Sequence, residues 1–292
     1  MRRSDLPSVF RRAAGFVLVA ALGLALTACS QPSGGTPAAS GTSTTDVTLA
    51  STTSTQDSGL FDVLIPAFEA ANPAYKVKVV AVGSGEALNL GQNKDADVLL
   101  VHSPSAETSF VAAGFGTDRK PVMYNDFLIA GPAADPAKIK GDASAVDAFA
   151  KIAAAKSVFV SRGDTSGTYT KEVSIWASAT VDPKGQAWYL STGQGMGETL
   201  QVANEKHGYT LVDRATWLTN ADKNPDLTLL LEGDTKLFNP YHVILIPGAK
   251  NAAGAKAFED WIVGADGQKV IGEFGVAQFN QQIFVPNANA AN

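Results

Sequence analysis

From residue 46 onward, segments with the hydrophobic pattern of β-strands alternate with segments that have the pattern of α-helices. Three segments have the alternating or continuous apolar pattern of strands: 46–50, 76–82 and 96–101. A segment with helical features follows each of them: 58–71, 86–90 and 105–114. In the first, Leu60, Leu64 and Phe68 recur at i, i+4 and i+8, which places them on one helix face. This order predicts an α/β fold with a mostly parallel sheet and helices on its faces.

The second half of the chain continues this alternation. Strands are expected at 126–130, 157–161 and 241–247, and helices at 142–155, 166–177, 194–206, 255–263 and 267–274. Apolar segments at 209–213, 214–218 and 227–233 lie between them. In such sheets ligands bind at the carboxyl ends of strands, where loops lead into helices. These loops are therefore where a binding site is expected.

The first 28 residues have the anatomy of a secretory signal. A basic start precedes the apolar run A-A-G-F-V-L-V-A-A-L-G-L-A-L, which is too short to span a membrane comfortably. The run leads into L-T-A-C, residues 26 to 29, which resembles the box of bacterial lipoproteins. This resemblance implies cleavage before Cys29 and lipid attachment to its sulfur. The alternative is an ordinary signal peptide with a stray cysteine; Cys29 is the only cysteine, so it has no disulfide partner.

The segment after the signal predicts a flexible tether, residues 29–45. Its residues are small, polar and uncharged, so they bury too little surface to order themselves. Removing residues 1–28 takes away four Arg and one Asp and lowers the formal charge from −5 to −8. An acidic protein argues against nucleic-acid partners, and any bound anion has to be held by local groups. The remaining residues, 46–292, can bury a large core and form two lobes.

Three of the expected strand-to-helix loops share one composition: 51–59, 83–86 and 161–168. Each combines hydroxyl residues and glycine at the start of a helix, where unpaired amides and the helix dipole favour negative charge. For a single loop, ordinary helix capping explains these residue types better. Three such loops in one α/β chain indicate a shared anion site.

Arg162 is the one arginine in these loops. It could be a surface residue paired with an acid such as Asp164 or Glu172, because weak pairs of that kind are common. Its planar set of donors could instead meet two oxygens of an oxyanion, with Ser166, Gly167 and Thr168 adding donors from the helix start. The spacing R-x-x-x-S-G-T favours the second interpretation.

This spacing is similar to the anion loop of phosphate-binding proteins of bacterial importers. The whole body looks closer to the tungstate-binding proteins of ABC importers, of the TupA type. The matching stretches are S-T-T-S-T-Q-D-S-G-L, V-V-A-V-G-S-G-E-A-L, D-A-D-V-L-L-V-H, P-V-M-Y-N-D-F, S-R-G-D-T-S-G-T, T-G-Q-G-M-G-E-T-L, Y-T-L-V-D-R and F-N-P-Y. The family carries T-T-T-S in its first loop, where this chain has Ser51; serine keeps the hydroxyl.

The resemblance implies a two-lobe type II periplasmic-binding-protein fold, with a hinge of two strand crossings and the ligand cleft between the lobes. The crossings are expected near 124–128 and 238–243. The first lobe would be 46–124 plus 241–292, and the second 125–240. The implied substrate-binding residues are Thr52, Thr53, Ser54, Ser84, Arg162, Ser166, Gly167 and Thr168. The glycine-rich loop 193–197 is a weaker candidate, since a turn explains it equally well.

The resemblance also implies function and location. The protein would be exported, held by its lipid at the outer face of the cell membrane or in the periplasm, and would deliver tungstate to an ABC importer permease and its ATPase. A monomer without a cofactor is expected. An enzyme is disfavoured, because no G-x-S-x-G elbow, nucleotide loop or metal-ligand spacing occurs. His102, at the end of a strand, is expected to be a structural residue.

The same fold could also bind molybdate, sulfate or phosphate. Tungstate, molybdate and sulfate are fully deprotonated near neutral pH, so their pocket needs only donors. Phosphate keeps a proton and requires an acceptor. Asp97 and Asp164 are the candidate acceptors, and the sequence does not place either of them relative to the ligand.

Overall fold

The computed structural model describes residues 44–289. The predicted signal peptide, Cys29 and the tether up to residue 43 lie outside the described residues, as do residues 290–292. None of the described helices is long and apolar enough to cross a membrane.

The main sheet has the strand order β10-β4-β9-β3-β1-β2. Its parallel part consists of β1 (Thr45–Thr52), β2 (Tyr75–Val82) and β3 (Val98–Val101). The strands β9 (Phe238–Leu245), β4 (Thr117–Pro132) and β10 (Val285–Pro286) are antiparallel to their neighbours. The prediction of a mostly parallel sheet is therefore wrong. The chain runs from one end of the molecule to the other along β4 and runs back along β9. Because the two strands run in opposite directions, they pair antiparallel.

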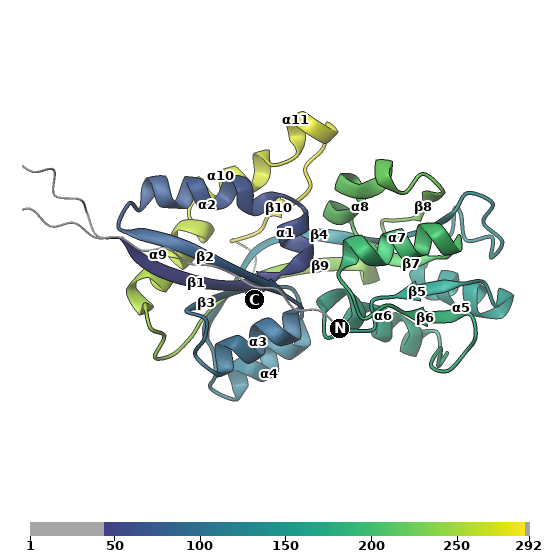
Figure 1. Ribbon diagram of the computed structural model, residues 1–292, viewed down its shortest axis with the longest axis horizontal. Coiled ribbons are helices and arrows are strands. Elements are labelled where there is room, and N and C mark those ends of the chain that lie inside the picture. The colour runs from purple at the N-terminus through teal and green to yellow at the C-terminus, as the bar shows by residue number, and fades with distance from the viewer. Residues whose placement is uncertain (1–43, 290–292) are drawn as a thin grey trace, which may run out of the picture. The chain divides into compact units, whose positions relative to one another are not determined.

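β4 belongs to two groups of strands. Its first half pairs with β9 and β10, and its second half pairs with β7 (Thr210–Asp213) and β8 (Leu227–Leu231). The short strands β5 (Phe159–Ser161) and β6 (Tyr189–Ser191) form a parallel pair, which Phe159 joins to Tyr209 beside β7. β4 thus connects the two ends of the structure in Figure 1.

The helices gather around these two groups of strands. Around β1–β3 lie α1 (Thr53–Asp57), α2 (Leu60–Ala71), α3 (Ser84–Gln92), α4 (Pro104–Ala112), α9 (Ala252–Val263), α10 (Ala265–Glu273) and α11 (Val276–Phe279). Around β5–β8 lie α5 (Ala145–Ala155), α6 (Gly167–Ser178), α7 (Met196–Lys206) and α8 (Arg214–Asn220), with the short 3₁₀ turns Ala221–Lys223 and Thr235–Leu237. We call the first set, with β1–β3, the first lobe and the second set, with β5–β8, the second lobe.

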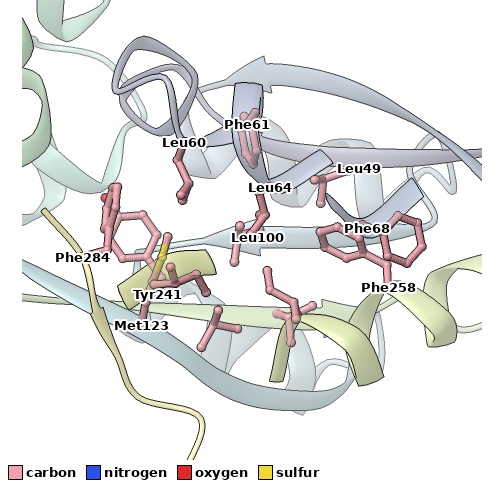
Figure 2. Close-up of a cluster of buried hydrophobic side chains, with 14 of the residues drawn as sticks. Leu49, Leu60, Phe61, Leu64, Phe68, Leu100, Met123, Tyr241, Phe258 and Phe284 are labelled. Atoms are coloured by element: carbon pink, nitrogen blue, oxygen red, sulfur yellow. The ribbon is translucent and has the colours of Figure 1, made fainter. Parts of the chain in front are cut away.

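Each lobe has its own core. In the first lobe, Leu60, Leu64 and Phe68 are fully buried, which confirms the predicted helix face (Figure 2). Phe68 meets Phe258 of α9 edge to face, with ring centroids 5.2 Å apart. In the second lobe, aromatic residues such as Trp176 fill the centre. Burying each large apolar side chain contributes about 1.5–3 kcal/mol, so the lobes hold their loops on rigid supports.

Candidate functional site

The first loop joins β1 to α1 and buries a cluster of hydroxyl groups. Thr52 caps α1, and its Oγ1 accepts the backbone N–H of Thr55 at 3.3 Å. The same atom lies 2.7 Å from the Thr55 hydroxyl and 3.2 Å from that of Ser54. All three side chains are buried, whereas Thr53 between them is half-buried. Hydroxyls donate as well as accept, so this cluster can turn protons toward a neighbouring anion.

The second loop begins α3 and reaches the third loop through its backbone. Ser84 is fully buried, and its hydroxyl has no hydrogen-bond partner. The N–H of Gly85 donates to the carbonyl oxygen of Thr165 at 2.9 Å. A Cβ on Gly85 would lie 2.9 Å from the Cβ of Thr165, so only glycine permits this approach. Loops from the two lobes are thus in direct contact.

The third loop carries the start of α6. Ser166 caps this helix by accepting the N–H of Tyr169 at 3.1 Å, so the expected helix cap is present. Thr168 is 1% exposed, and its hydroxyl has no partner. A Cβ on Gly167 would lie 2.6 Å from the carbonyl oxygen of His102 in the first lobe. Capping therefore accounts for Ser166 but leaves Thr168 unexplained.

Arg162 is buried with only part of its donor set in use. Its Nη2 donates to Asp164 Oδ2 at 2.6 Å and to Thr53 Oγ1 at 3.4 Å. Its side chain is 3% exposed, and its Nε has no partner. The pair with Asp164 that the sequence offered as an alternative exists, but it is not a surface pair. Arg162 lies between the lobes with a donor still available.

His102 follows β3 and braces the first loop. Its Nδ1 lies 2.9 Å from Asn239 Oδ1 and its Nε2 3.4 Å from Ser54 Oγ. Asn239 donates from its Nδ2 to Asn125 at 2.7 Å, which leaves its oxygen to accept from Nδ1. Burial, aided by the positive charge of Arg162, lowers the pKa of His102 to about 4 despite the hydrogen bond with Asn239, so the ring is neutral at physiological pH. Its ring stacks on Tyr241 of β9 with centroids 4.6 Å apart, consistent with the expected structural role.

The two candidate acceptors have other partners. Asp97 Oδ2 accepts the N–H of Thr48 at 2.8 Å, and its Oδ1 accepts that of Asn251 at 2.8 Å. These bonds hold Asp97 before β3, at the opposite end of that strand from His102. Asp164 Oδ1 accepts the N–H of Ser166 at 3.0 Å, while its Oδ2 pairs with Arg162. Both carboxylates are thus used inside the protein.

The glycine-rich loop 193–197 supports the third loop from behind. The N–H of Gly193 donates to the Arg162 carbonyl at 2.7 Å, and that of Thr192 donates to the Ser161 carbonyl at 3.0 Å. These main-chain bonds fix the backbone at Arg162. The loop therefore has a bracing position beside the third loop.

Each of two loops and Arg162 contributes a buried polar group that has no hydrogen-bond partner. Ser84 Oγ, Arg162 Nε and Thr168 Oγ1 are buried without partners among the described residues. A buried polar group without a hydrogen bond costs about 1–3 kcal/mol, so three neighbouring donors of this kind are suited to a group that accepts from all of them. No group of three His, Cys, Asp or Glu residues that could hold a metal ion occurs between residues 44 and 289. A small anion that accepts on every side fits these donors best.

The fold and these loops define a class of protein. Residues 36–266 match the PBP superfamily domain. Combined with two lobes joined by β4 and β9, this match shows the two-lobe periplasmic-binding-protein fold that the sequence predicts.

Individual relatives show which family within this class the chain belongs to. The tungstate-binding protein TupA of Peptoclostridium acidaminophilum is 48% identical over 249 residues, which cover 83% of this chain and 86% of that protein. The solved structure of the tungstate-binding protein TupA from Desulfovibrio alaskensis G20 is 46% identical, with a TM-score of 0.70, covering 84% of this chain and 99% of that one. That of the tungstate ABC transporter from Geobacter sulfurreducens is also 46% identical, with a TM-score of 0.71, covering 78% and 98%. The chain belongs to the TupA family.

Proposed function

We propose that this protein captures tungstate between its lobes and delivers it to an ABC importer. The observation that carries the proposal is the set of unpaired buried donors at Ser84, Arg162 and Thr168. The proposed ligand contacts are those expected from the sequence: Thr52, Thr53, Ser54, Ser84, Arg162, Ser166, Gly167 and Thr168. The names of its relatives support the choice of tungstate.

The state of the carboxylates supports a fully deprotonated ligand. Phosphate near neutral pH carries a proton and needs an acceptor for it. Asp164 is held by Arg162 and Ser166, and Asp97 binds backbone amides elsewhere. Phosphate would therefore have to displace one of these bonds or use a neutral hydroxyl such as that of Ser84 or Thr168 as its acceptor, whereas tungstate, molybdate and sulfate would need neither. Molybdate stays the nearest alternative, since both anions have the same charge and shape.

Closure of the lobes is part of this proposal. The proposed boundaries are 46–124 plus 241–292 for one lobe and 125–240 for the other, with the crossings at 124–128 and 238–243. Separate cores on either side of β4 and β9 support them. The bond from Gly85 to Thr165 is a contact that would form on closing and break on opening. Ala215 packs with the first core, so α8 would slide during this motion.

The proposed setting is outside the cytoplasm. Cleavage before Cys29 and lipid attachment would anchor the protein as a monomer, through a flexible tether, at the outer face of the membrane or in the periplasm. The permease and ATPase of an importer would be its partners. Binding without turnover fits a site of donors in which the one histidine, His102, is hydrogen-bonded on both nitrogens.

Competition calorimetry tests the proposal. The soluble body, titrated with tungstate, molybdate, sulfate and phosphate, should bind tungstate and molybdate tightly, sulfate more weakly and phosphate least. Equal or tighter binding of phosphate would show that an acceptor is available in the pocket, and would contradict the donor-only site. Hydrolysis of ester or phosphate substrates by the pure protein would contradict the binding role.

A further inference from the structure

A buried carboxyl group lies directly behind the third loop. Glu172 is on α6, four residues after Thr168, so both side chains share one face of the helix one turn apart. Glu172 is 1% exposed. It takes no part in the proposed anion contacts.

Only neutral groups hydrogen-bond this carboxyl within the described part of the chain. Its Oε1 accepts from the Tyr189 hydroxyl at 2.7 Å and from Trp176 Nε1 at 3.1 Å. The hydroxyl of Ser161, the residue before Arg162, is a further donor. No lysine or arginine between residues 44 and 289 forms an ion pair with it. Neutral donors replace only part of the hydration that a buried carboxylate loses.

Burial and the nearby negative charge both raise the pKa of Glu172. Burial, aided by the negative charge of Asp164, raises the pKa of Glu172 to about 7, against the opposing effect of hydrogen bonds from Tyr189, Ser161 and Trp176. Tyr189 stays neutral because burial raises the pKa of its hydroxyl. From α5 the neighbouring group is apolar, with the ring of Phe149 against Trp176. Glu172 thus exchanges its proton near neutral pH.

Asp164 connects this carboxyl to the anion loop, because it holds both Arg162 and the N–H of Ser166. A dianion bound by the same loop would add a larger negative charge close to that of Asp164. This would further disfavour an ionised Glu172. We propose that Glu172 takes up a proton from the solvent when an oxyanion is captured. The inference rests on the proposed function and adds a proton linkage to it.

The coupling between anion binding and protonation of Glu172 determines whether the tungstate affinity rises or falls with pH. A dianion that raises the pKa of Glu172 must bind more weakly as the pH rises through that pKa. The loss of affinity should approach about tenfold for each unit by which binding raises the pKa. Glutamine keeps the shape and an acceptor oxygen for Tyr189 and Trp176 and mimics the protonated acid. Glu172→Gln should therefore bind tungstate more tightly than the wild type at high pH, which loss of a merely structural residue would not produce.

The experiment is calorimetry with tungstate from about pH 6 to about pH 9, in two buffers with different ionisation enthalpies. Wild-type heats should differ between the buffers by the number of protons taken up multiplied by the difference in ionisation enthalpy, and Glu172→Gln should give equal heats and a flat pH profile. Glu205→Gln removes an exposed carboxylate in the last turn of α7, outside the three loops, and is the matched control, which should keep the wild-type linkage.

Equal wild-type heats in both buffers would overturn the inference while leaving anion binding intact. Proton uptake that persists in Glu172→Gln would assign it to another group and overturn it too. If that variant does not fold, Tyr189→Phe decides the question. Loss of the Tyr189 donor raises the pKa of Glu172, so the midpoint must move to higher pH, and an unmoved midpoint contradicts the inference. A wild type that binds none of the four anions removes the proposed function itself.

Discussion

Replacing Arg162 with alanine should weaken tungstate binding more than any other single change in the loops. Arg162 is 3% exposed, so its contact with a ligand would be shielded from water. Removing a charge-assisted contact from such a site costs about 2–5 kcal/mol. This corresponds to a loss of roughly 30-fold to several thousandfold in affinity. Alanine also leaves the Asp164 carboxylate without its partner, facing a dianion, which moves the expected loss toward the upper end of the range.

Three further variants separate the causes of this loss. Arg162→Lys keeps the charge without the planar donor set and should bind more weakly than wild type but better than alanine. The double change Arg162→Ala with Asp164→Asn removes the stranded carboxylate and should recover part of the affinity. Lys206→Ala deletes an exposed charge at the end of α7, where salt screens it, and should bind as the wild type does.

Calorimetry with tungstate measures all four variants, and thermal unfolding checks that each remains folded. Arg162 lies in a loop after β5 and outside the cores, so the fold should survive the change. If folded Arg162→Ala binds tungstate as tightly as the wild type, the third loop is only a helix cap, and the anion site lies elsewhere.

Four more outcomes are expected. Thr168→Val deletes one unpaired donor at nearly constant volume and should cost about 1–3 kcal/mol of binding in calorimetry, less than Arg162→Ala. Cys29→Ser should move the protein from the membrane to the soluble fraction, and retention in the membrane would refute the lipid anchor. Small-angle scattering should show a more compact protein with tungstate, together with a higher melting temperature, since a ligand that binds only the folded state stabilises it. Because the pKa of Glu172 is raised to about 7, its contribution to stability is full below the ordinary carboxyl pKa and is lost as the pH rises to about 7. Denaturant unfolding should show that Glu172→Gln removes about 3 kcal/mol of that pH-dependent change.

Local periodicity predicted the long elements well and the short or non-local ones poorly. The helix face of Leu60, Leu64 and Phe68 follows from spacing alone. The strand predicted at 126–130 is in fact β4, Thr117–Pro132. Its first half is rich in charged residues and contains Pro121, so no apolar pattern marks it. Pairing with β9 and β10, which are far away in sequence, makes it a strand.

The composition of the loops predicted which residues gather, but not which donors remain free. The contact between Thr53 and Arg162 joins residues 109 positions apart, and no local pattern encodes it. The helix cap at Ser166 was expected from its residue type, whereas the lack of a partner for the buried Thr168 hydroxyl is visible only in the folded structure. Asn239, which orients His102, was missed as a site residue. The stretch F-N-P-Y contains it and resembles the family, but a lone amide carries no chemical signal of its own.

The charge balance of the site explains why unpaired donors, more than net charge, should decide selectivity. Arg162 is already neutralised by Asp164, and the protein as a whole is acidic. Long-range attraction of an anion is therefore weak, and most of the binding free energy has to come from contacts made inside the closed cleft. There each unpaired donor already bears the cost of its lost hydration. An anion that accepts from Ser84, Arg162 and Thr168 together recovers this cost, whereas a protonated anion also needs an acceptor for its proton, which only a hydroxyl such as that of Ser84 or Thr168 could supply by giving up its role as a donor. Discrimination against phosphate would thus follow from the same unpaired groups that are proposed to bind the anion.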